Sequence, residues 1–130
     1  MLFFDVAALE QMKSGASSLN DEKWATYSVK LGWYVQGIFP RAKSGDHVNG
    51  VDRNKAGDII ATGCDWGFVN LYRNPALKGA KCNSYRAHSS HVVRVAFDAG
   101  DNYLYSTGGY DKTLMMWKVC WSMITLKKYK

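Results

Sequence analysis

The chain has 130 residues, and its 47% hydrophobic and 22% charged residues are the balance of a folded domain, which excludes a disordered chain. The formal net charge of +6 favours an acidic partner, but no basic run with interleaved aromatic residues indicates a nucleic-acid platform. No stretch approaches the ~20 apolar residues of a membrane span, and the start of the chain lacks the features of a signal peptide. We therefore expect neither nucleic acid nor a membrane as a partner.

The spacing of the cysteines indicates the cellular compartment of the protein. Cys64, Cys82 and Cys120 are widely separated and have no C-x-x-C spacing. An odd number of distant thiols favours reduced cysteines over disulfides. We therefore expect a cytoplasmic protein.

The front third of the chain predicts only parts of a sheet. Residues 2–6 are mostly apolar and resemble residues 115–119 in type, which predicts the third strand of a preceding unit. Residues 11–21 are polar and small, so they predict a loop. Residues 24–29 alternate between apolar and polar side chains and predict an outer strand. The aromatic segment at residues 31–40 follows.

Two copies of one pattern occupy most of the remaining chain. His91 follows His47 by 44 residues, whereas Thr107 follows Thr62 by 45 residues. This difference predicts one inserted residue in the turn between the first two strands of the second copy. Repeats tolerate such a change in a turn while they keep the register on both sides.

Each copy contains three short predicted strands. In the second copy, residues 108–112 indicate a tight turn, and residues 114–119 form an almost continuous apolar run, as in a strand buried on both faces. A further strand over residues 82–86 precedes this copy, which gives four antiparallel strands in about 45 residues. Those are the dimensions of one blade of a β-propeller. We therefore predict an all-β protein.

The second copy resembles a WD40 repeat at four positions. Such repeats have a His in the incoming loop, a Ser or Thr on the second strand, an Asp in the next turn and a Trp on the third strand. Here these are His88, Thr107, Asp111 and Trp117, and residues 111–117 match the ending D-x-T-hydrophobic-x-x-W. The resemblance implies a structural network of hydrogen bonds through these four side chains. A buried carboxylate and a buried imidazole both need such partners.

The first copy departs from this pattern. It keeps Thr62, but Trp66 stands where the second copy has Asp111, Tyr72 stands where it has Trp117, and the incoming loop has no clear His. We expect this degenerate blade to lack the network. It should be held instead by packing of apolar and aromatic side chains: Trp66, Phe68, Leu71 and Tyr72.

Several segments resemble one particular family of proteins with WD40 repeats. They are L-G-W-Y-V-Q-G-I-F-P at residues 31–40, D-H-V-N-G-V-D-R at 46–53, and residues 61–72, 87–92 and 106–109. Together they resemble the echinoderm microtubule-associated protein-like family over residues 2 to 119. The resemblance implies tandem propellers that associate with tubulin or microtubules, and a location in the cytoskeleton, including cilia or flagella.

The resemblance implies a WD40 β-propeller with about two four-stranded blades and part of a preceding one. The expected divisions are a preceding strand and family-specific connector at 1–40, a degenerate blade at 41–80, a blade with the network at 81–119, and a basic tail at 120–130. A propeller ring typically closes with about 4–8 blades. We therefore expect a fragment that self-associates through its open blade faces.

The expected function is that of a non-enzymatic scaffold that binds proteins, with tubulin or microtubules as the partner and without a cofactor or metal. Candidate partner-binding residues lie at blade tops or add positive charge. They are Ser89, His91, Tyr110, His47 and Asp65 at blade tops, with Arg41, Lys43, Arg53 and Arg94 as charged residues.

Other functional classes find less support. A generic peptide-docking scaffold of a signalling or ubiquitin-ligase complex is the alternative, and only residues 35–40 argue against it. A hydrolase would need a nucleophile, but no G-x-S-x-G elbow or comparable motif accompanies His88 and Asp111. His88 and His91 are three residues apart, yet no Cys or Glu cluster nearby supports a zinc site.

Overall fold

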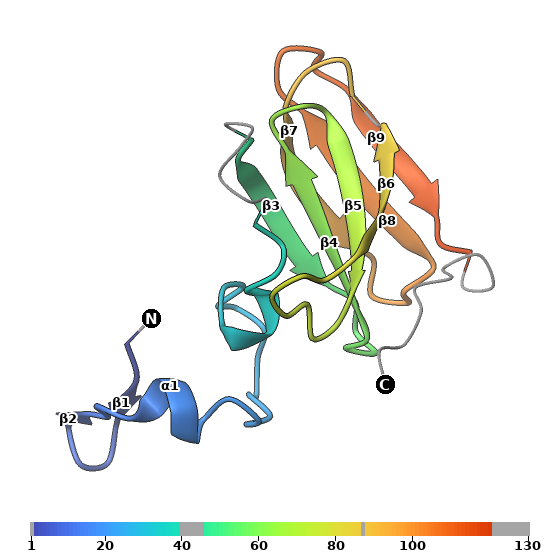
Figure 1. Ribbon diagram of the computed structural model, residues 1–130. Coiled ribbons are helices and arrows are strands. Elements are labelled where there is room, and N and C mark those ends of the chain that lie inside the picture. Colours follow the sequence, from blue (N-terminus) through green and yellow to red (C-terminus); the bar gives the residue numbers. More distant parts are fainter. Residues whose placement is uncertain (1, 40–45, 87, 121–130) are drawn as a thin grey trace.

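The computed structural model describes residues 2–39, 46–86 and 88–120. Figure 1 shows two antiparallel sheets lying face to face, with the N-terminal segment extending away from them. Within these residues, the only helices are α1 (Gly15–Ser18) and a 3₁₀ turn, η1 (Trp33–Val35). No helix in the described ranges is long and apolar enough to span a membrane. The predicted all-β class is confirmed.

The first sheet is a four-stranded meander in the order β3-β4-β5-β6, and the second is a three-stranded meander in the order β7-β8-β9. The strands of the first are β3 (Val48–Arg53), β4 (Ile59–Cys64), β5 (Phe68–Arg73) and β6 (Cys82–Arg86). Those of the second are β7 (Val92–Phe97), β8 (Tyr103–Gly108) and β9 (Leu114–Lys118).

The first turn of each sheet is closed in the same way by a short polar side chain. The amide oxygen of Asn54 accepts hydrogen bonds from the backbone N–H groups of Asp58 and Ile59, at 3.0 and 2.9 Å. In the second sheet, a carboxylate oxygen of Asp98 accepts from the N–H of Tyr103 at 2.7 Å. Asn and Asp favour turns because they can make such local bonds.

The strand at residues 82–86 belongs to the first sheet, and its predicted place in the second copy is wrong. Cys82 pairs with Tyr72, and Arg86 pairs with Phe68. The connection between β5 and β6 is short enough to return the chain along β5, whereas the chain crosses to the other sheet only after Arg86. Among the described residues, β9 therefore has no strand on its outer edge.

The register corrects the predicted insertion. Thr62 pairs with Val51, and Ser106 pairs with Val95, so the two copies keep an offset of 44 residues across their first turns. The offset becomes 45 residues only on the third strands, β5 and β9. The extra residue of the second copy consequently lies in the turn between β8 and β9, and the counterpart of Thr62 is Ser106.

The main core lies between the two sheets. Its buried members are Ile59, Ala61, Val69 and Leu71 from the first sheet and Val92, Val95 and Leu104 from the second. Full burial of such a side chain contributes about 1.5–3 kcal/mol of transfer free energy. All six residues of β4 are buried, as expected for a central strand covered on both faces.

β9 is covered on one face only. Leu114 and Met116 are 69% and 62% exposed, while Trp117 packs partly buried against the main core. The expectation that residues 114–119 form a strand buried on both faces is therefore wrong. The almost continuous apolar run suggested burial on both faces. However, no sheet among the described residues lies over the outer face of β9.

The aromatic segment that follows residue 31 covers the other face of the first sheet. Val35 and Ile38 are 1% exposed and form a second core with Ile60 and Tyr72. The backbone N–H of Gly37 donates to the carbonyl of Ala76 at 2.7 Å, and a Cβ atom on Gly37 would lie 1.9 Å from the carbonyl oxygen of Leu77. The segment is therefore a close-fitting cover for the sheet.

The N-terminal segment contains less sheet than predicted. Within residues 2–6, only β1 (Phe4–Asp5) is a strand, and it pairs with β2 (Glu10–Gln11). Residues 24–29, predicted as an outer strand, form no strand. An alternating pattern forms a strand only when it pairs with another strand, and residues 24–29 pair with none in the described part of the chain. Trp24 instead stacks on Phe3, with ring centroids 6.0 Å apart.

Polar contacts tie the two sheets together at the end opposite the β4–β5 turn. A carboxylate oxygen of Asp52 accepts from the backbone N–H of Phe97 at 2.8 Å. Asp101 accepts from the N–H groups of Lys55 and Ala56 at 2.8 and 2.9 Å. Hydrogen bonds to a charged acceptor are stronger than neutral ones, so these contacts help to fix how the sheets pack.

Candidate functional site

His88 is the centre of a buried hydrogen-bond network in the second sheet. Its Nε2 lies 2.8 Å from Oγ of Ser106, which also accepts a hydrogen bond from the indole N–H of Trp117 at 2.9 Å. Its Nδ1 lies 3.0 Å from a carboxylate oxygen of Asp111 and 2.8 Å from the hydroxyl of Thr113. Because Ser106 can donate to Nε2 while it accepts from the indole, the Nδ1 proton is left for Asp111.

The structure brings His88, Asp111 and Trp117 together in one network, but Thr107 is not part of it. Ser106 takes that place, because side chains alternate across a strand and Ser106 shares the inward face of β8 with buried Leu104. A slip of one residue moves a side chain to the opposite face of the sheet. Ser106, two residues after Leu104, therefore points to the same buried face.

The network joins the loop before β7 to the turn after β8. Besides His88, the carboxylate of Asp111 accepts hydrogen bonds from the backbone N–H groups of Ser89 and Thr113, each at 3.2 Å. Desolvation by burial acts to raise the pKa of Asp111, but the hydrogen bonds from Thr113 and His88 outweigh it and hold that pKa below its usual value. Asp111 is thus a charged anchor for both loops.

The first sheet has no such network among the residues that the structure describes. The counterpart of Ser106, Thr62, is fully buried, and its hydroxyl has no hydrogen-bond partner there. Leu71 and Tyr72 are buried as predicted, but Trp66 is 60% exposed, so its predicted packing role is wrong. The physical reason is that Trp66 lies in the β4–β5 turn, beyond the end of the sheet.

A shallow hollow lies where the loops of both sheets converge, and we name it the loop-edge hollow. It is lined by Asp65, Trp66, Arg86, Ser89, Ser90, His91 and Tyr110. Four of these were predicted as partner-binding residues: Asp65, Ser89, His91 and Tyr110. Trp66 and Arg86 were missed, although an aromatic residue in a turn, where no core can cover it, is a usable sequence signal.

Two glycines bring the walls of the hollow together. Gly67 has a φ of +78°, and a Cβ atom there would lie 2.2 Å from the carbonyl oxygen of His88. A Cβ atom on Gly109 would lie 2.0 Å from the ring of His91. That ring packs edge-on to Tyr110, with centroids 5.2 Å apart. Only glycine allows such close approach at these points.

Asp65 is already engaged by side chains of its own sheet. Its carboxylate oxygens lie 2.7 Å from Nδ1 of His47 and 2.8 Å from the donating amide nitrogen of Asn49. The hydrogen bonds from Asn49 and His47 lower the pKa of Asp65, so it is ionised at neutral pH. His47, another residue predicted to bind a partner, does not line the hollow but contacts Asp65, which does.

Comparison with known proteins decides the family. Residues 1–119 match the model of the echinoderm microtubule-associated protein second beta-propeller. The chain belongs to the echinoderm microtubule-associated protein family. The predicted resemblance and the predicted propeller fold are both confirmed.

Individual relatives agree with this assignment. The chain is 49% identical over 118 residues to the ciliary WD repeat-containing protein ctxp80 of Euplotoides octocarinatus, with 91% of the chain and 16% of the relative covered. It is 42% identical over 120 residues to a 77 kDa echinoderm microtubule-associated protein of Lytechinus variegatus, with 92% of the chain and 18% of the relative covered. For human echinoderm microtubule-associated protein-like 1 the identity is 37%, with 92% and 15% covered. The chain therefore spans less than a fifth of the length of these relatives.

Two further predicted residues, Arg53 and Arg94, do not line the loop-edge hollow. Arg53 ends β3 at the opposite end of the sheet, where its guanidinium lies 4.1 Å from the ring centroid of Tyr27. Arg94 is exposed on β7 and pairs with Thr107. Arg41 and Lys43 lie outside the described residues.

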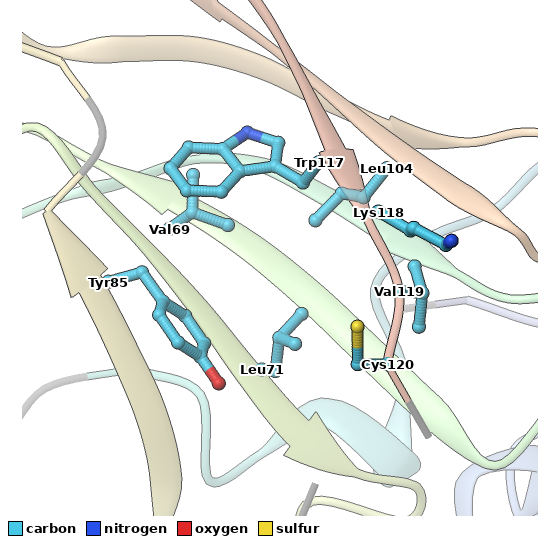
Figure 2. A pocket seen from close by; sticks show the side chains of 8 residues that line it. All are labelled: Val69, Leu71, Tyr85, Leu104, Trp117, Lys118, Val119 and Cys120. Atoms are coloured by element: carbon cyan, nitrogen blue, oxygen red, sulfur yellow. The ribbon is translucent and has the colours of Figure 1, made fainter. Parts of the chain in front are cut away.

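A second, apolar pocket of about 200 Å³ opens between β5 and β6 on one side and β9 on the other. Figure 2 shows Val69, Leu71 and Tyr85 facing the side chains of Leu104 and Trp117 across it, with residues 118–120 at its rim. It lies beside the outer edge of β9. Among the described residues, no group of three or more His, Cys, Asp or Glu side chains could hold a metal ion.

Proposed function

We propose that this chain is part of a non-enzymatic scaffold that binds tubulin or microtubules through the loop-edge hollow. The observation that carries the proposal is the exposure of Trp66 and Tyr110, at 60% and 87%, beside Arg86 at the loop edge of the two sheets. Trp, Tyr and Arg are the residues that dominate binding energy at protein interfaces. A microtubule-associated family supplies the class of partner.

The location follows the same reasoning. Relatives carry the names of microtubule-associated proteins, and one is a ciliary protein. We therefore propose a location in the cytoskeleton of the cytoplasm, including cilia or flagella. Its net charge of +6 suits an acidic surface such as that of a microtubule.

Co-sedimentation with intact microtubules tests the proposal. The bound fraction should fall as salt rises, because ions screen attraction between exposed charges beyond about 10 Å at 0.1 M. Trp66→Ala should lower the bound fraction at every salt concentration. Trp24→Ala is the matched control, because Trp24 is 53% exposed but lies in the N-terminal segment.

Two outcomes would count against the proposal. The first is an absence of salt-sensitive pelleting by the folded chain, and the second is an equal effect of the two tryptophan substitutions. A tubulin-free pull-down rich in ligase subunits would favour the alternative, a peptide-docking scaffold of a signalling or ubiquitin-ligase complex.

A further inference from the structure

The loop-edge hollow carries hydrogen-bond donors that this chain leaves unused. Tyr110 and Ser89 line the hollow, and neither hydroxyl has a partner among the residues that the structure describes. Arg86 forms no ion pair within the same ranges. From this excess of donors we infer that the hollow binds a carboxylate of an extended, acidic peptide segment, with Arg86 as its ion-pair partner. The inference builds on the proposed docking function and names the chemistry of the docked segment.

Arg86 is held in place for such a contact. It is the last residue of β6, and its guanidinium lies 5.6 Å from the ring centroid of Phe68 on the neighbouring strand. A guanidinium packed against an aromatic ring loses less freedom when it binds. Its planar donors match the two oxygens of a carboxylate, so bidentate binding is favoured.

The acidic side chains of the same edge do not use these donors. The carboxylate of Asp65 is bonded by His47 and Asn49, and that of Asp111 by His88 and backbone N–H groups. Asp46 accepts from the backbone N–H of Asp65 at 3.1 Å. Each carboxylate is thus satisfied within the chain, while the donors of Arg86, Tyr110 and Ser89 stay available for an acceptor from outside.

The walls of the hollow indicate a peptide and not a small free anion. Trp66 and Tyr110 stand on turns of different sheets, and both are mostly exposed. Their rings offer apolar contact area on which the backbone and neighbouring side chains of a peptide can pack. A shallow site of this kind requires an extended segment to bury enough area.

Direct binding of a labelled probe tests the inference. A short fluorescein-labelled glutamate-rich peptide is titrated with the whole chain, and fluorescence anisotropy gives the dissociation constant. Arg86→Gln should raise the dissociation constant by at least about tenfold. The substitution removes a hydrogen bond between two charged groups, and the loss of such a bond typically weakens binding by this factor. The dissociation constant of Arg86→Lys should lie between those of the wild type and Arg86→Gln, because lysine keeps the charge and loses the bidentate geometry.

Two controls distinguish binding in the loop-edge hollow from non-specific attraction between an acidic peptide and a basic chain. Lys55→Gln removes the same charge from an exposed turn at the opposite end of the first sheet and should leave affinity within about twofold. A glutamine-rich peptide of equal length should not bind measurably. Thermal melting of each variant checks that it is folded.

The results distinguish this inference from the proposed function. Equal losses in Arg86→Gln and Lys55→Gln, or no binding of the glutamate-rich peptide, would overturn the inference even if microtubule pelleting persists. Peptide binding that depends on Arg86, without any microtubule pelleting, would support the inference and overturn the proposed partner.

Discussion

At the scale of single residues, the second sheet depends on Ser106. Its hydroxyl is the only atom of the described chain that contacts both the His88 imidazole and the Trp117 indole through hydrogen bonds. Thr62 occupies the corresponding place in the first sheet, with no partner for its hydroxyl in the described ranges. The two positions therefore share geometry and differ in what their hydroxyls do.

This difference predicts opposite responses to removal of the hydroxyl. Ser106→Ala should lower the free energy of unfolding by about 1–3 kcal/mol, because it leaves buried polar atoms of His88 and Trp117 without a partner. Thr62→Val should be neutral or stabilising, because it removes a buried hydroxyl that makes no bond. Urea denaturation of the wild type and both variants measures the change.

Thr107→Val is the control for the assignment of Ser106, and not Thr107, to the network. Thr107 faces away from the network, so this variant should stay within about 0.5 kcal/mol of the wild type. A loss from Thr107→Val as large as that from Ser106→Ala would contradict the assignment of Ser106.

At the scale of elements, the aromatic segment before β3 works as a cover. The WD40 pattern does not account for it, and its interior residues Val35 and Ile38 are almost fully buried against β4 and β5. Its family-specific sequence therefore has a structural role of its own. The strand predicted at residues 24–29 did not form, because these residues pair with no strand among the described residues.

Adjacent residues of this cover should differ sharply in their contribution to stability. Ile38→Ala should lower the free energy of unfolding by about 2–5 kcal/mol, because it removes a buried aliphatic side chain and leaves a cavity. Phe39→Ala should have little effect, because Phe39 is 51% exposed. Thermal or urea unfolding of the two variants makes the comparison, and similar losses would show that the cover does not pack as described.

At the scale of the whole molecule, no sheet among the described residues covers the outer face of the second sheet. The offset of 45 residues places Leu114 and Met116 at the positions of Val69 and Leu71, which the second sheet covers. Leu114 and Met116 are instead more than 60% exposed. Exposed apolar sheet faces favour association.

We expect self-association of the chain to depend on this face. Met116→Lys should reduce it, because a lysine placed in an apolar contact must lose its hydration. Val6→Lys is the matched control, since Val6 is 84% exposed but lies in the N-terminal segment. Sedimentation velocity over a range of concentrations measures the effect, and a monomeric wild type would contradict the expectation.

Local pattern in the sequence was sufficient for the all-β class and the two copies, and the resemblance to WD40 repeats pointed to His88, Asp111 and Trp117. Strand alternation and tight turns depend on near neighbours in the chain, so they can be read without a structure. The tertiary structure alone decided that Ser106 replaces Thr107, that β6 completes the first sheet, and that Trp66 and Arg86 border the loop-edge hollow. Those features depend on pairing register and on loops from two sheets meeting in space, because burial is set by what packs against a residue and not by the residue itself.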